Sequence, residues 1–164
     1  METLKKYLRP FYVPIANWHY KTFKAPRRYH HLYDEIKRLK AESILEVGVY
    51  NGRRAIKMLD TAKTQVAIPE YHGFDLFEDL GEEGYQAELS KMPLSESEIK
   101  TLLESTGAKI NLYRGNTLEV LPKLVSDLPK VDFIFIDGGH SNETIANDWK
   151  YTSQLMLSLI HISE

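Results

Sequence analysis

The stretch 44–52, with sequence ILEVGVYNG, constrains the fold more than any other part of the chain. A short apolar run carries one acid, Glu46, and two glycines come after it, Gly48 and Gly52. A helical pattern begins directly after them, at Arg53. Strand, glycine-containing turn and helix in this order are typical of the first unit of a cofactor-binding α/β domain. Because the apolar run shows no alternation, we expect a strand buried on both faces, as in a parallel sheet.

Composition limits the possible function classes. The 164 residues are 43% hydrophobic and 27% charged, which is ordinary for one soluble globular domain. A formal net charge of −2 gives no argument for nucleic acid or an anionic membrane as partner. There is no cysteine, so thiol catalysis, disulfides and cysteine-based zinc sites are excluded. No apolar run reaches the length of a membrane span, and a cytoplasmic location is the default expectation.

The first 28 residues differ from the rest of the chain. They hold seven lysines and arginines against one acid, with aromatic residues between them. Such an arm could bind a nucleic-acid strand, but we favour packing of its aromatics on the domain with the charges in water. A lid over a substrate pocket and a homodimer contact stay open. We therefore divide the chain into an arm (1–28), a domain (29–156) and a final segment (157–164).

The remaining pattern alternates strands with helices. We expect helices from about 29 to 40, 53 to 59, 96 to 105, 118 to 125 and 142 to 155, and strands over 43–47, 71–77, 109–113 and 131–136, with a short edge segment at 66–68. Ser95 and Glu98 form a capping box, and Thr117 is the expected cap of the next helix. This order predicts a Rossmann-like, doubly wound parallel sheet with right-handed crossovers.

Polar residues stand where each expected strand ends. They are Glu46 in the first strand, Asp75 after the second, Asn116 after the third, and Asp137 with His140 after the fourth. In doubly wound sheets, ligands bind beyond the carboxyl ends of the strands, at the point where the strand order reverses. Four such features in successive units therefore predict a single site at this edge of the sheet.

The chemistry of these residues narrows the cofactor. Dinucleotide-binding proteins use Gly-x-Gly-x-x-Gly so that a pyrophosphate meets a helix N-terminus, and that triplet is missing here. A carboxylate at Glu46 would repel a pyrophosphate but suits a cation. Asp75 could accept two ribose hydroxyls. A positively charged adenosine cofactor without phosphate fits, and S-adenosylmethionine is one.

Two further segments support this interpretation. The chain reads GFDLFE over 73–78 and IDGGHSNE over 136–143. With the Glu-x-Gly-x-x-x-Gly loop, these resemble the class I S-adenosylmethionine-dependent methyltransferases, in the branch of small-molecule O-methyltransferases with an IDGGHS motif. The likeness runs from about residue 43 to 151. It implies methyl transfer to the hydroxyl of a small-molecule acceptor, and a sheet of seven strands.

The resemblance also assigns cofactor contacts. The methionine end would lie on the first loop, at Glu46, Gly48, Tyr50 and Gly52, with Tyr50 replacing the middle glycine of many methyltransferases. The ribose would bind Asp75. The adenine would lie beside Leu76 (or Phe74) and Asn116, although Gly-Asn-Thr is also ordinary turn chemistry.

The reacting end would involve the turn after the fourth strand. The resemblance places Asp137 beside the transferring methyl group and, in metal-dependent members, makes it a ligand of a divalent cation such as Mg²⁺. His140 could be the base, a second ligand, or a group that holds the loop through Asp137. On the next helix, we expect Asp148 to face solvent or cap a contact, and Trp149 to lie in the core.

The end of the chain does not fit a complete domain, since only four of seven expected strands are present. The last eight residues, LSLIHISE, match the translation of CTGTCTCTTATACACATCTCCGAG, which resembles a transposon-end adapter of sequencing libraries. We therefore expect Met156 to be about the last natural residue, and the chain to hold an inactive cofactor half-site; a true apolar helix end is the alternative. An RNA methyltransferase, an NAD-binding oxidoreductase and a non-enzymatic scaffold are the competing functions.

Overall fold

The computed structural model describes residues 29–79, 94–139 and 141–157. The chain divides into two compact units, Met1–His31 and Leu32–Glu164, and the second unit contains the sheet. The basic arm, His140 and the last seven residues lie outside the described residues.

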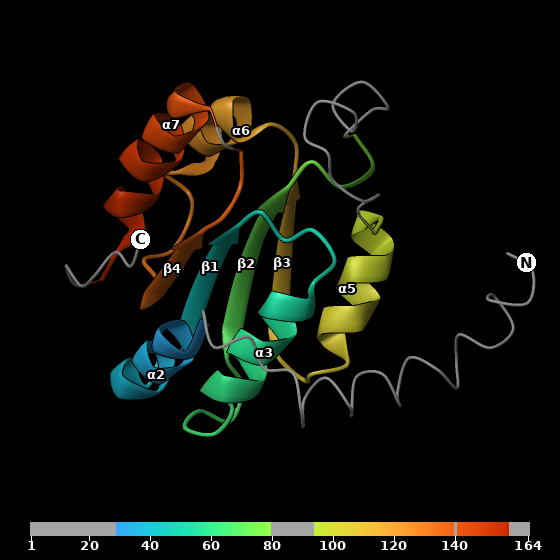
Figure 1. The fold of residues 1–164 in the computed structure, drawn as a ribbon, viewed down its shortest axis with the longest axis vertical. Helices are drawn as coiled ribbons and strands as arrows, with labels where there is room; N and C mark the ends of the chain where they lie inside the picture. The colour runs from blue at the N-terminus through green and yellow to red at the C-terminus, as the bar shows by residue number, and fades with distance from the viewer. Residues whose placement is uncertain (1–28, 80–93, 140, 158–164) are drawn as a thin grey trace, which may run out of the picture. The chain divides into compact units, whose positions relative to one another are not determined.

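Four parallel strands form one sheet in the order β3-β2-β1-β4 (Figure 1). They are β1 (Ser43–Val47), β2 (Glu70–Asp75), β3 (Lys109–Arg114) and β4 (Phe133–Ile136). The chain runs outward from β1 to β3 and then crosses back to place β4 on the other side of β1. The doubly wound prediction is therefore confirmed, and the strand order reverses between β1 and β4.

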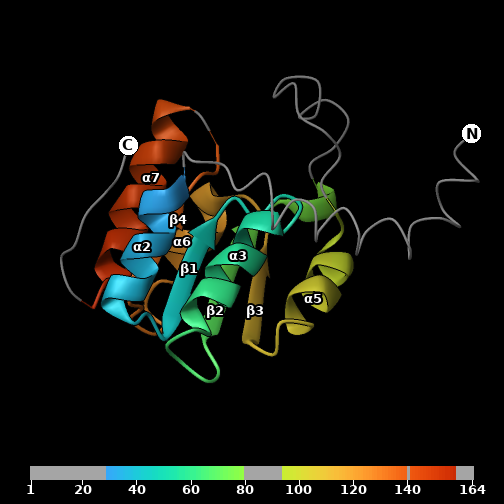
Figure 2. The same ribbon diagram turned by 60° about the horizontal axis from the view of Figure 1, so that its bottom comes forward.

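Helices cover both faces of the sheet, as Figures 1 and 2 show. One apolar cluster joins the first face of the sheet to α2 (His30–Leu39), α3 (Arg53–Ala62) and α5 (Glu96–Glu104). A second cluster joins the other face to α6 (Thr117–Leu124) and to η3 (Ser153–Leu155), a 3₁₀ turn that comes after α7 (Asn142–Thr152). Another 3₁₀ turn, η2 (Phe77–Asp79), comes after β2. None of the helices among the described residues is long and apolar enough to cross a membrane.

Most local expectations are confirmed, but several are wrong; β2, for example, spans Glu70–Asp75 and not 71–77. Ser95 and Glu98 form the predicted capping box of α5. The cap of α6 is Asn116 and not Thr117, because the Asn116 side chain accepts the Leu118 N–H. Residues 66–68 form no strand. β4 begins at Phe133, two residues late, because Val131 pairs instead with Met156 on the outer side of β4.

The expectations for α7 are reversed. Asp148 is fully buried, whereas Trp149 is 42% exposed. The inward stripe of α7 consists of polar and small residues at helical spacing, such as Asn147, Asp148 and Thr152. The apolar Ile145 and Trp149 lie on the outward face, so hydrophobicity alone indicates the wrong side of this helix.

Candidate cofactor site

The turns after β1 and β4 lie in direct backbone contact. The Asp137 N–H donates to the Val47 carbonyl (2.8 Å), and the Gly48 N–H donates to the Phe74 carbonyl (2.9 Å). A Cβ at Gly48 would lie 2.3 Å from the Asp137 carbonyl oxygen, and Gly48 has φ +91°. Both the conformation and the contact require glycine. This packing brings Asp137 to the reversal point, beside the first loop.

Gly52 has a different environment from Gly48. It is buried at the N-cap of α3 with φ +69°, and a Cβ there would lie 3.2 Å from Ile99 Cδ1 and 3.3 Å from Leu102 Cδ2. Packing of α3 on α5 therefore accounts for this glycine, and its contact with a cofactor stays a prediction.

Glu46 is completely buried near the end of β1. The Tyr71 hydroxyl donates a hydrogen bond to Glu46 Oε2, while Oε1 has no hydrogen-bond partner among the described residues. Burial raises the pKa of Glu46 to about 8, although Tyr71 and Arg54 oppose the shift. The pKa of Tyr71 is raised well above its ordinary value, first by burial and then by Glu46. A cationic ligand would therefore find a carboxyl oxygen that accepts no hydrogen bond here.

Arg54 links the two acids of the site and is absent from the residues predicted from the sequence. Its Nη1 lies 2.5 Å from Asp137 Oδ2 and 3.7 Å from Glu46 Oε1, and its guanidinium lies over the Phe135 ring, 4.9 Å from the centroid. One signal could have revealed it. A cation in the first turn of a helix opposes the helix dipole, so an arginine this close to Gly52 indicates an acidic partner.

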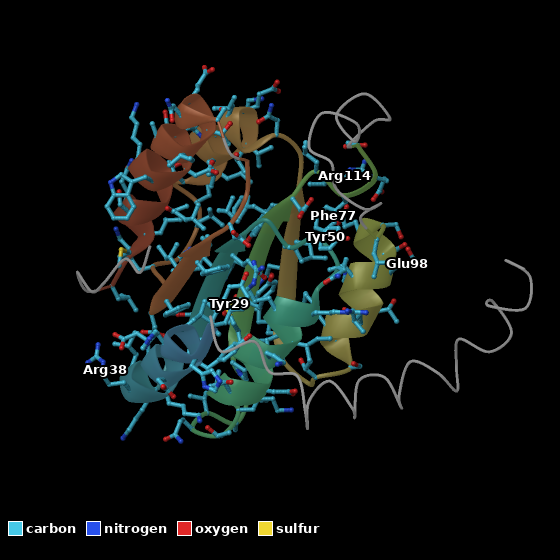
Figure 3. The ribbon with its side chains drawn as sticks, viewed as in Figure 1. Tyr29, Arg38, Tyr50, Phe77, Glu98 and Arg114 are labelled. Atoms are coloured by element: carbon cyan, nitrogen blue, oxygen red, sulfur yellow. The ribbon has the colours of Figure 1, made fainter. Side chains whose placement is uncertain are left out.

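Asp75 is held by two backbone groups from different segments. Its Oδ2 accepts the Tyr50 N–H (2.7 Å) and its Oδ1 accepts the Phe77 N–H (3.0 Å). Both donors are non-glycine residues in the left-handed region, with φ of 54° for Tyr50 and 49° for Phe77, a conformation that L-residues seldom adopt. Figure 3 shows Tyr50 and Phe77 together at the carboxyl end of the central strands. The carboxylate is thus fixed, and its remaining lone pairs are available to a diol.

Asn116 follows β3 and Leu76 follows β2, away from the reversal point between β1 and β4. Asn116 is exposed, and its Oδ1 accepts the Leu118 N–H (3.0 Å) as the α6 cap. The side-chain NH₂ group, a donor, is therefore the part suited to a ligand. Leu76 is half-buried in the short link between β2 and η2.

The structure brings most of the predicted residues to one edge of the sheet. Glu46 and Asp137 meet through Arg54, and Tyr50 binds Asp75. Gly52 faces α5 instead, and His140 lies outside the described residues. Within the part of the chain that the structure describes, no three His, Asp or Glu side chains are grouped so as to hold a metal ion.

A family model described as "Methyltransferase domain" matches residues 45–158, more than half of the chain. The chain belongs to the methyltransferase-domain family. The predicted resemblance is thereby confirmed at the level of the family. No match was found among curated protein sequences.

Solved structures of O-methyltransferases share the fold of this methyltransferase chain. One is TomG from Streptomyces achromogenes, involved in tomaymycin synthesis and solved with S-adenosylmethionine: 16% identity, TM-score 0.57, covering 87% of this chain and 59% of that one. Another is an O-methyltransferase from Bacillus cereus with S-adenosylhomocysteine: 15% identity, TM-score 0.56, covering 94% and 68%.

A third is MycE of the mycinamycin pathway, solved with Mg, S-adenosylhomocysteine and mycinamycin VI: 16% identity, TM-score 0.52, covering 82% of this chain and 31% of that one. At these identities the likeness concerns the fold alone. The methyltransferase chain spans little more than half the length of several matched structures, 53% of one and 59% of TomG.

Proposed function

We propose that this methyltransferase transfers a methyl group from S-adenosylmethionine to the hydroxyl of a small molecule, and that the described residues form the cofactor side of the site. The observation that carries the proposal is the meeting of Glu46, Asp75 and Asp137 at the reversal point of the sheet. These three acids outnumber Arg54, which lies between two of them, and the set suits a cationic ligand without phosphate. TomG, solved with S-adenosylmethionine, has the same fold.

The residues present fit such a cofactor. The buried Oε1 of Glu46, which accepts no hydrogen bond, and the carboxylate of Asp137 would attract its positive charge. The fixed carboxylate of Asp75 would accept the ribose hydroxyls, with Tyr50 beside it. The NH₂ group of Asn116 would donate to an adenine ring nitrogen, since its oxygen already caps α6. Gly48, which has no side chain, lets the loop after β1 lie against the backbone of Asp137.

When bound, the cofactor would supply an electrophilic methyl group on a positively charged sulfur. The chain's own contribution would be positioning, which can lower a barrier substantially by holding two reactants in line. Asp137 is exposed at the site, where it could orient an acceptor hydroxyl or take its proton, with His140 as the second candidate base. Arg54 would hold the Asp137 carboxylate in place.

Assistance by Mg²⁺ at Asp137 stays a prediction. MycE was solved with Mg. In this chain, however, Asp137 Oδ2 already lies 2.5 Å from the Arg54 guanidinium, and the described residues offer no group of three ligands. These residues alone do not fit a divalent cation, so no step of the proposed transfer involves one.

The role of Asp75 can be tested by titrating S-adenosylhomocysteine into three proteins by calorimetry. We expect Asp75→Asn to weaken binding by about tenfold or more, because a charge-assisted bond to the ribose is lost and one backbone N–H faces an NH₂ group. Asp127→Asn removes an exposed acid distant in sequence and serves as the control. Equal affinity in the wild type and Asp75→Asn would contradict the proposed site.

A further inference from the structure

Asp148 is a buried acid that the proposed chemistry does not use. It lies in the second turn of α7 and is fully buried, whereas its neighbours Trp149 and Lys150 are exposed. Its Oδ2 has no hydrogen-bond partner among the described residues. Burial of a carboxyl oxygen without a hydrogen bond lowers the stability of the fold, so the presence of an acid here calls for a reason beyond packing.

Asp148 and the preceding residue tie α7 to the start of α6. Burial raises the pKa of Asp148, whereas the neighbouring Thr117 and Asn147 side chains oppose this shift. Asn147 Nδ2 donates to Asp148 Oδ1 (3.4 Å). Asn147 Nδ2 also donates to the Thr117 carbonyl (3.0 Å). Thr117 is the first residue of α6 and comes directly after Asn116. The carboxyl group of Asp148 therefore lies at the base of the loop that carries the predicted adenine contact.

The same carboxyl group also reaches the loop after β4. A Cβ at Gly138 would lie 3.6 Å from Asp148 Oδ2 and 2.9 Å from Val47 Cγ1. A side chain at position 138, next to Asp137, would thus be in van der Waals contact with this oxygen. Asp148 thus lies close to two loops that are about 20 residues apart in the sequence and that both belong to the proposed cofactor site.

We propose that Asp148 is a positioning residue that sets the loop of Asn116 and the loop of Asp137 relative to each other. Its Oδ2 lies close to the second loop, while its Oδ1 accepts from the Asn147 amide that also donates to the Thr117 carbonyl of the first. The part of this inference that concerns the cofactor rests on the proposed function. The mechanical link between the two loops does not.

Hydrogen exchange tests the link without any cofactor. The Leu118 and Asp137 N–H groups are both hydrogen-bonded, to Asn116 Oδ1 and to the Val47 carbonyl. We expect Asp148→Asn to speed exchange at both amides together, by about tenfold, and to leave the Ile99 amide of α5 unchanged. Glu143→Gln removes an exposed acid from the same helix and is the control. Faster exchange in α7 alone, or at neither loop, would overturn the proposal.

Binding of S-adenosylhomocysteine tests the consequence for the site. We expect Asp148→Asn to weaken binding of this ligand about tenfold. In a protein that already carries Asn116→Ala, the same substitution should weaken binding clearly less, because the effects of two groups that act through one another are not additive. If Asp148→Asn lowers the melting temperature but binds the ligand with wild-type affinity, Asp148 has a packing role only, and the proposed effect on the cofactor site is wrong. If the wild type binds none of this ligand, the proposed function fails while the exchange result still decides the link. Should Asp148→Asn not fold, Asn147→Ala removes the amide that joins Asp148 Oδ1 to the Thr117 carbonyl and serves the same two measurements.

Discussion

At the scale of the residue, the buried carboxyl group of Glu46 couples folding to cofactor chemistry. Burial raises its pKa to about 8 from an ordinary value of 4.5, so the group holds a proton at neutral pH. A cation placed near its Oε1, which accepts no hydrogen bond, would favour the ionised form. Binding of a cationic cofactor should therefore release a proton from this site.

The same pKa shift predicts a pH dependence of stability. Between about pH 4.5 and 8, the unfolded chain has lost the Glu46 proton while the folded chain retains it, so the free energy of unfolding falls as pH rises through this window. In Glu46→Gln, we expect the free energy of unfolding to fall by roughly 2–4 kcal/mol less over this window than in the wild type. Urea unfolding at pH 5 and pH 8.5 measures it.

Glu143→Gln, on the exposed side of α7, is the matched control and should behave as the wild type does. Parallel pH profiles for Glu46→Gln and the wild type would show that Glu46 is ionised in the folded protein throughout this range.

At the scale of the element, the end of α2 shows a motif that normally contains glycine. Lys40 has φ +50°, its N–H donates to the Lys37 carbonyl (3.1 Å), and the Ala41 N–H donates to the Ile36 carbonyl (3.1 Å). This pair of bonds is a Schellman motif with lysine in the left-handed position. The side chain of Lys40 is exposed and adds little packing.

We expect Lys40→Gly to stabilise the protein by about 0.5–1 kcal/mol, because glycine adopts this conformation without strain. Lys37→Gly, in the same helix but with a right-handed backbone, should destabilise it by about 1 kcal/mol. Urea midpoints of the two variants give the comparison. Destabilisation by both substitutions would contradict the assigned helix end.

The elements differ in how far the sequence predicts them. β1 is predicted to the residue, because a continuous apolar run before Gly48 has few alternatives. The α5 boundary is set by Ser95 and Glu98, whose capping is local. The inward face of α7 could not be predicted, because Asp148 is buried by contacts with α6 and the β4 loop that are distant in sequence.

At the scale of the whole molecule, the site exists only because the sheet reverses direction at β1. The order β3-β2-β1-β4 places the loops after β1, β2 and β4 side by side. The sequence predicted this edge from its polar strand ends, and it predicted Asp75 and Asp137 as members. The role of Arg54 was not predicted. Its place in the first turn of α3 indicates an acidic partner, but the partners Glu46 and Asp137 are known only from the folded structure.

The central claim is that this edge binds a positively charged, phosphate-free adenosine cofactor. Calorimetric titration of the chain with S-adenosylmethionine, S-adenosylhomocysteine and NAD in parallel tests it most directly. We predict saturable one-site binding of the first two ligands with affinities in the micromolar range, and no measurable binding of NAD. Binding of NAD with equal or higher affinity, or of none of the three ligands, would contradict the account.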